Sequence, residues 1–111
     1  AFQAQVRQLA ATLGWTVHCA WLSIRSPAGY PDLTLVHPQE QRVVWLELKT
    51  EKGKLTGAQE SWIETLRRAG QEAWAIRPSQ WDFLVQILRP RGTKEEIEST
   101  KEEEVGFHPH G

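Results

Sequence analysis

The residues with the clearest chemical potential are two charges at the end of an apolar segment. The segment VVWLELK, residues 43–49, is typical of a β-strand, yet it carries Glu47 and Lys49. Side chains two residues apart on a strand share one face, so these two are predicted to lie together. An unpaired buried carboxylate is costly, so Glu47 requires a cation, a metal ion or water. The alternate positions are predicted to face the core: Val44, Leu46 and Leu48.

A second carboxylate is predicted to lie beside Glu47. Asp32 follows Pro31 at the start of DLTLVH, residues 32–37, and the short connection PQEQR joins this segment to the Glu47 strand. That connection is short enough for an antiparallel hairpin, and a hairpin register can place Asp32 next to Glu47. Two carboxylates that share one site repel each other unless a cation lies between them.

Magnesium suits a carboxylate pair of this kind. It binds one or two protein carboxylates, keeps several waters and completes its octahedral shell with phosphate oxygens of a substrate. It can also lower the pKa of a bound water for attack on a phosphodiester, and Lys49 would place positive charge beside that reaction. Simpler interpretations stay open. Glu47 and Lys49 can form the solvated end of a strand, and Asp32 can accept from turn N–H groups after Pro31.

Local patterns predict a helix and a strand before the candidate site, and a helix after it. Helical spacing of apolar residues predicts a helix over residues 2–13, and β-branched and aromatic residues predict a strand over residues 15–21. After Lys49, Thr56 and Gln59 have the spacing of a capping box, which predicts a helix from there through residue 69.

The remaining elements complete an α/β chain. Residues 72–76 are predicted to form a fourth strand, which follows a crossover helix and is therefore parallel to the strand with Glu47. Ser79 is predicted to cap a last helix. The order helix, three strands, helix, strand, helix (αβββαβα) predicts a small mixed sheet flanked by helices, in one domain over residues 1–91.

Length and charge limit the possible functions. The chain has 111 residues, one cysteine and no apolar run of the roughly 20 residues that a membrane helix needs, so we expect a soluble intracellular domain without a membrane partner. Its 13 Lys and Arg against 14 Asp and Glu hide an asymmetry. Residues 1–91 hold 11 basic and 8 acidic residues, whereas residues 92–111 hold two and six. The second range is predicted to be a flexible acidic tail.

The spacing of the charged residues resembles the signature of a nuclease superfamily. Pro31-Asp32, fourteen residues and then Glu47-Leu48-Lys49 resemble the PD-(D/E)xK pattern. The longer segments GYPDLTLV, VVWLELKTEKGKLTGAQESWIETLRRAG and AWAIRPSQWDFL resemble the VRR-NUC domain, the virus-type replication and repair nuclease module, over about residues 2–88. The resemblance implies a restriction-endonuclease-like core and metal-dependent cleavage of DNA.

The resemblance also implies roles for individual residues. Asp32 and Glu47 would be metal ligands together with the backbone carbonyl of Leu48, and Lys49 would be the catalytic lysine. Gln59 would support the lysine or the attacking water, although its place in the capping box explains it equally well. The ion would be Mg²⁺, for which Mn²⁺ can substitute, and no small-molecule cofactor is expected.

Three basic residues flank this site and are candidates for contacts with DNA phosphates: Arg25, Lys52 and Lys54. A solvated loop is the alternative explanation for them. Similar stand-alone modules from phages and bacteria act as homodimers on DNA, some with a preference for branched junctions. We therefore expect a homodimer that acts on duplex or branched DNA, such as a Holliday junction, during replication, repair or recombination in the cytoplasm of a bacterium or phage-infected cell.

The first helix departs from the family pattern. The family usually carries a further Glu there, whereas residues 2–8, FQAQVRQ, hold no acid. That Glu would lie upstream of Ala1 or be missing. The alternative function is therefore a catalytically inactive DNA-binding or interaction module that keeps the nuclease fold.

Overall fold

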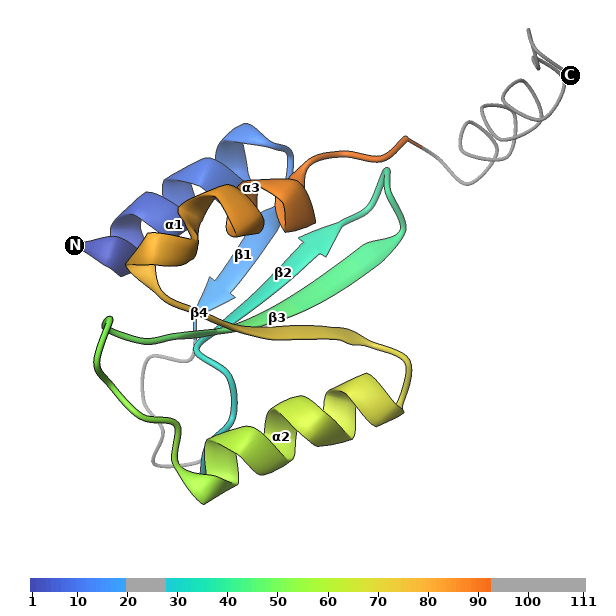
Figure 1. Ribbon diagram of the computed structural model, residues 1–111. Helices are drawn as coiled ribbons and strands as arrows, with labels where there is room; N and C mark the ends of the chain where they lie inside the picture. Colours follow the sequence, from blue (N-terminus) through green and yellow to red (C-terminus); the bar gives the residue numbers. More distant parts are fainter. Residues whose placement is uncertain (20–27, 93–111) are drawn as a thin grey trace, which may run out of the picture.

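A mixed four-stranded sheet is formed within residues 1–19 and 28–92, the part of the chain that the computed structural model describes (Figure 1). The elements are α1 (Phe2–Thr12), β1 (Thr16–Cys19), β2 (Leu33–His37), β3 (Arg42–Leu48), α2 (Gly57–Arg68), β4 (Glu72–Ile76), the 3₁₀ turn η1 (Pro78–Gln80) and α3 (Trp81–Leu88). The strand order is β1-β2-β3-β4, with β1, β2 and β3 antiparallel and β4 parallel to β3. The predicted αβββαβα order and the mixed sheet are confirmed.

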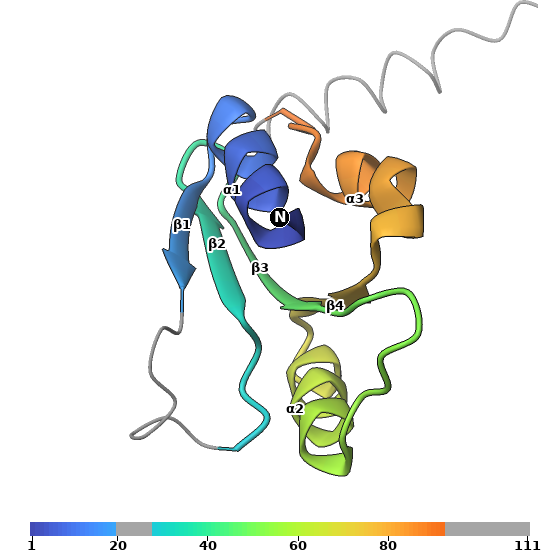
Figure 2. The same cartoon turned by 90° about the vertical axis from the view of Figure 1, so that its left-hand side faces the viewer.

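The sheet separates two layers that differ in composition. Helices α1 and α3 cover one face, and α2 lies on the other (Figures 1 and 2). The alternation of side chains along β2 and β3 directs their fully buried aliphatic residues to the α1–α3 side. The core on that side consists of Val6, Ala10, Trp15, Cys19, Leu33, Leu35, Val44, Leu46, Ile76, Leu84, Ile87 and Leu88. The opposite face of β3 therefore presents Trp45 and Glu47 toward α2.

Helix α2 begins as its sequence predicts. Thr56 is the N-cap, and its hydroxyl and the side chain of Gln59 complete the reciprocal bonds of a capping box. The helix runs over Gly57–Arg68, with Ala69 as the C-cap. Two basic residues in the last turn, Arg67 and Arg68, suit the negative end of the helix dipole.

The start of α3 differs from the prediction. Ser79 does not cap this helix: it lies in η1, and α3 begins at Trp81 without a side-chain cap hydrogen bond. The Ser79 hydroxyl donates instead to Glu51 Oε2 at 2.8 Å. The Ser79 hydroxyl, which a local capping pattern assigns to the start of α3, is therefore bound by the carboxylate of a residue far away in the chain.

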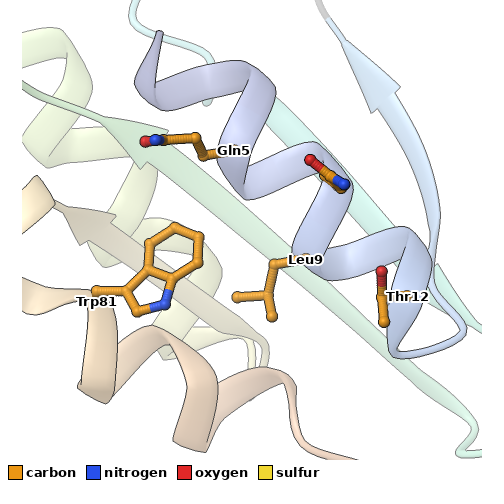
Figure 3. Close-up of a pocket in the computed structure, with 5 residues that line it drawn as sticks. Gln5, Leu9, Thr12 and Trp81 are labelled. Carbon is orange, nitrogen blue, oxygen red and sulfur yellow. The ribbon is translucent and has the colours of Figure 1, made fainter.

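A surface pocket lies between α1 and α3 (Figure 3). Both helices cover the sheet face opposite α2. The volume of the pocket is about 380 Å³, and it is lined by Gln5, Gln8, Leu9, Thr12 and Trp81. Because neither Asp32 nor Glu47 lines it, this pocket is separate from the predicted catalytic site.

Some sequence predictions fall outside the described residues. These are the end of the predicted strand at Trp21, the candidate Arg25, and the acidic tail from residue 93 onward. The division into a domain at 1–91 and a tail stays a prediction. Among the helices that the structure describes, none is long and apolar enough to cross a membrane.

Candidate active site

The hairpin of β2 and β3 brings two acidic residues together at one end of the sheet. Leu33 pairs with Leu46, so Asp32, one residue before β2, lies opposite Glu47. The backbone N–H of Asp32 donates to Glu47 Oε2 at 3.1 Å, and the N–H of Leu48 donates to Asp32 Oδ2 at 2.9 Å. The two carboxylates are thus held side by side, as the predicted register requires.

Glu47 is buried although it carries a carboxylate, with only 3% of its surface exposed. Burial, followed by the negative charge of Asp32, raises the pKa of Glu47 from 4.5 to about 7. Lys49 acts in the opposite direction, because its Nζ lies 4.0 Å from Glu47 Oε1. The raised pKa shows that Lys49 compensates the negative charge at this position only in part.

Gln59 connects α2 to the carboxylate pair. The Oε1 of its side-chain amide accepts from the backbone N–H of Thr56 at 2.9 Å, and its backbone N–H donates to Thr56 Oγ1 at 3.1 Å. The nitrogen of the side-chain amide, Nε2, donates to Glu47 Oε1 at 2.5 Å. The side chain that a capping box explains therefore also contacts the candidate site.

Substitutions at Thr56 and Gln59 are expected to separate these two contacts. Thr56→Ala removes only the cap and should lower the free energy of unfolding by about 1 kcal/mol. Gln59→Ala also removes a hydrogen bond to a carboxylate, so we expect a loss of about 2–3 kcal/mol at about pH 8, where Glu47 is charged. Urea denaturation of both variants measures the difference. Equal losses would show that the Gln59–Glu47 bond adds no stability.

The loop that leads into Asp32 packs closely on α2. Gly29 has a φ of +80°, and a Cβ added there would lie 2.4 Å from the α2 backbone. Tyr30 packs edge-on against Trp62 with ring centroids 5.1 Å apart, and its hydroxyl accepts from Trp45 Nε1 at 3.1 Å. Sequence reasoning missed the role of this glycine. The Gly-Tyr-Pro sequence directly before the aspartate was the available signal, because glycine suits a close backbone approach.

A methyl group at Gly29 is expected to displace this loop. We expect Gly29→Ala to lower the free energy of unfolding by roughly 2–4 kcal/mol, because it combines a left-handed backbone conformation with a backbone clash. Gly57→Ala is the matched control, since a Cβ at Gly57 meets no atom within 4 Å. That control should be neutral or stabilise α2 by up to about 1 kcal/mol. Thermal or urea denaturation that ranks the two variants in the opposite order would contradict the packing described here.

The basic candidates after Lys49 lie on the loop between β3 and α2. Lys52 and Lys54 are exposed, and within the described ranges neither takes part in an ion pair. Arg25, the third candidate, lies outside the described residues. Arg77, which sequence reasoning did not single out, contacts the backbone of this loop directly after Lys49. No local sequence signal indicates that contact, because 27 positions separate Arg77 from Thr50.

The donor groups at the carboxylate pair suit a hard divalent cation. Asp32 and Glu47 supply carboxylate oxygens, and magnesium is commonly bound by one or two such groups with water and phosphate completing its shell. Zinc prefers histidine and cysteine, and the contacts described for Asp32 and Glu47 involve neither residue type. Over residues 1–19 and 28–92 no group of three or more His, Cys, Asp or Glu could hold a metal ion, so this site offers two carboxylates and would need water or substrate to complete a shell. The first turn of α1 contains no acidic residue. The residues present therefore fit magnesium better than zinc.

A mixed sheet that places an aspartate before β2 beside a Glu-x-Lys at the end of β3, with helices on both faces, defines a nuclease-type domain of the PD-(D/E)xK superfamily. The chain belongs to the VRR-NUC domain family, whose profile matches residues 4–81. A solved structure described as a VRR_NUC domain has 26% sequence identity and a TM-score of 0.60, and the match covers 75% of this chain and 92% of that chain. A search of curated proteins gave no match. Family membership confirms the resemblance seen in the sequence and implies a nuclease-type function on DNA, in a family that is in general metal-dependent.

Proposed function

We propose that this protein is a Mg²⁺-dependent endonuclease that hydrolyses phosphodiester bonds in DNA, with Mn²⁺ able to substitute. The Asp32–Glu47 pair carries the proposal. A buried carboxylate whose pKa is raised to about 7 lies directly beside a second carboxylate. A divalent cation between them would relieve both the repulsion and the cost of burying the charge.

Three groups of the chain would hold the ion: the carboxylates of Asp32 and Glu47 and the backbone carbonyl of Leu48. The N–H of Leu48 donates to Asp32. In an extended strand the N–H and C=O of one residue point to the same side, which favours a Leu48 carbonyl directed toward Asp32. Gln59 would keep Glu47 in one orientation through the bond to Oε1.

The bound ion would polarise the phosphoryl group and lower the pKa of the attacking water. Lys49 would stabilise the negative charge that develops on the phosphate and would orient the water. Its side chain is 18% exposed, so the ammonium lies at the edge of the site and can reach a substrate. Lys52 and Lys54, with Arg25, would bind phosphates on either side of the cleaved bond.

Cleavage of supercoiled plasmid and of a four-way DNA junction tests this proposal, with Mg²⁺, Mn²⁺ or a chelator. Asp32→Asn should abolish cutting, because it removes one of two charged ligands. Asp82→Asn is the matched control, since Asp82 is an exposed aspartate on α3 and should leave cutting unchanged. If the protein, extended upstream of Ala1 to include any native first-helix Glu, cuts no DNA, the proposal fails.

A homodimer that acts on branched DNA is the finer form of this proposal. Near the carboxylates one copy exposes two described lysines, Lys52 and Lys54, and each neutralised phosphate adds only part of the binding free energy. Two linked sites would raise the affinity for a duplex or junction through effective concentration. Light scattering and competition between junction and duplex test both features. A monomer that cuts both substrates equally would contradict them.

The alternative is a catalytically inactive DNA-binding or interaction module with the same fold. It is favoured by one observation, the absence of an acidic residue from the first turn of α1. The contacts among Asp32, Glu47, Lys49 and Gln59 favour the enzyme, because a decayed site would be expected to lose one of them. Metal-independent DNA binding without cleavage, measured by gel shift, would support the alternative.

A further inference from the structure

The backbone around Lys49 is tied to the segment that follows β4. The N–H of Lys49 donates to Ile76 O at 2.9 Å. The next residue after Ile76, Arg77, reaches the two residues after Lys49: its Nη1 donates to Thr50 O at 2.5 Å and lies 3.3 Å from Glu51 O, a second acceptor. Three successive residues of the chain are therefore held by Ile76 and Arg77.

A second tie holds the same turn through the side chain of Glu51. Its Oε1 accepts from the N–H of Ser79 at 2.5 Å, and its Oε2 accepts from the Ser79 hydroxyl at 2.8 Å. The turn is also closed internally, because Gly53 N donates to Thr50 Oγ1 at 3.0 Å. Together these bonds brace the first residues of the β3–α2 loop against η1.

The Glu51–Ser79 bonds also affect the charge around Lys49. Glu51 lies two residues from Lys49 and next to Lys52, so on an untied turn its carboxylate could compete for either ammonium group. Both of its oxygens are instead bound by Ser79. Within the described ranges the ion pair of Lys49 is with Glu47. The brace thus leaves Lys49 directed to the carboxylate pair.

We propose that Arg77 is a positioning residue for Lys49, acting through the carbonyls of Thr50 and Glu51. This role rests on the proposed nuclease function, in which the Lys49 ammonium must meet the reacting phosphate. Arg77 fixes the main chain directly after Lys49, and the bonds of Glu51 to Ser79 complete the brace. A displacement of about 1 Å at a reacting group can slow catalysis by on the order of 10²-fold.

Arg77→Met tests the role, because it keeps an apolar stem but removes the donor. We expect single-turnover cleavage with saturating enzyme to slow about 10–100-fold, while the Kd for DNA changes less than about 3-fold. Arg68→Met is the matched control: it removes the same charge from an exposed position on α2 and should cut at the parent rate. A change in DNA affinity without a change in cleavage rate would instead assign Arg77 to DNA binding.

A double variant distinguishes positioning from an independent effect. If Arg77 acts only through Lys49, then Lys49→Ala with Arg77→Met should cut no more slowly than Lys49→Ala alone. Multiplied losses would contradict the role. Amide hydrogen exchange gives a readout that does not depend on activity. Exchange at Gly53 N–H should accelerate in Arg77→Met, while Leu48 N–H, bonded to Asp32, should stay protected.

Glu51→Ala tests the second tie, and it also serves if Arg77→Met does not fold. It keeps the backbone carbonyl that Arg77 contacts but removes both bonds to Ser79, so cleavage should slow in the same direction as in Arg77→Met. If the parent protein cuts no DNA, the proposed function fails and this role fails with it. If the parent cuts and both variants cut at the parent rate, the role of Arg77 is rejected and the proposed function stands.

Discussion

Lys49→Ala is expected to slow DNA cleavage by about 10²–10³-fold at saturating Mg²⁺, the range observed when one preorganised group that stabilises developing charge is removed. The Nζ of Lys49 lies 4.0 Å from Glu47 Oε1, at the edge of the carboxylate pair. In the proposed mechanism, alanine would leave the negative charge that develops on the phosphate without this cation. Single-turnover cleavage of supercoiled DNA, with enzyme in excess, measures the loss in the reacting complex.

Two further measurements separate a loss of catalysis in Lys49→Ala from a loss of metal binding or DNA binding. A rise in melting temperature with Mg²⁺ should persist in this variant, because Asp32 and Glu47 are unchanged and a ligand that binds the folded state stabilises it. Lys54→Ala is the matched control, as it removes an exposed lysine from the same loop and should weaken DNA binding more than it slows cleavage. Equal cleavage rates for Lys49→Ala and the parent would reject the assignment of Lys49 as the catalytic lysine.

The elements that hold the site follow from local sequence patterns. Thr56 and Gln59 predicted the start of α2 because both halves of a capping box lie within four residues. The connection PQEQR predicted the antiparallel pairing that sets Asp32 opposite Glu47, since a short link leaves few alternatives for two apolar strands. Patterns of this kind depend on neighbours in the chain, and a single sequence contains them in full.

The contacts that refine the site come from segments far apart in the chain, and the sequence alone did not predict them. Gln59 meets Glu47 across 12 positions, and Ser79 meets Glu51 across 28. The second contact also explains why Ser79 was a wrong prediction as a helix cap: a charged acceptor from another loop competes for its hydroxyl. Local capping rules omit such a competitor, because its proximity exists only in the folded chain.

Glu47→Gln is expected to stabilise the metal-free protein at about pH 8, by roughly 3 kcal/mol, and to change its stability little at about pH 4. The pKa of Glu47 is raised from 4.5 to about 7 in the folded state. The folded state therefore binds this proton more tightly than the unfolded state. The resulting stabilisation is fully present below about pH 4.5 and is lost as the pH rises toward 7, so the parent carries the full cost of the buried charge above that pH. Glutamine has no charge to bury and avoids this loss.

Added Mg²⁺ should reverse the order of the two proteins at about pH 8. An ion at the proposed site would pair with the deprotonated carboxylate and raise the stability of the parent, whereas Glu47→Gln would offer a weaker ligand and should respond little. Below about pH 7 the proton competes with the metal, so the response of the parent should also weaken as the pH falls.

Urea denaturation with chelator or with Mg²⁺ measures these differences, and Glu64→Gln, at an exposed position on α2, controls for loss of one negative charge. If Glu47→Gln stabilises the protein at high pH yet gains as much from Mg²⁺ as the parent does, then the buried charge is real but the ion is bound elsewhere. If Glu47→Gln gains no stability relative to the parent between about pH 4 and pH 8 in chelator, the charge of Glu47 is already compensated within the fold, and the main physical reason to place a cation there is lost.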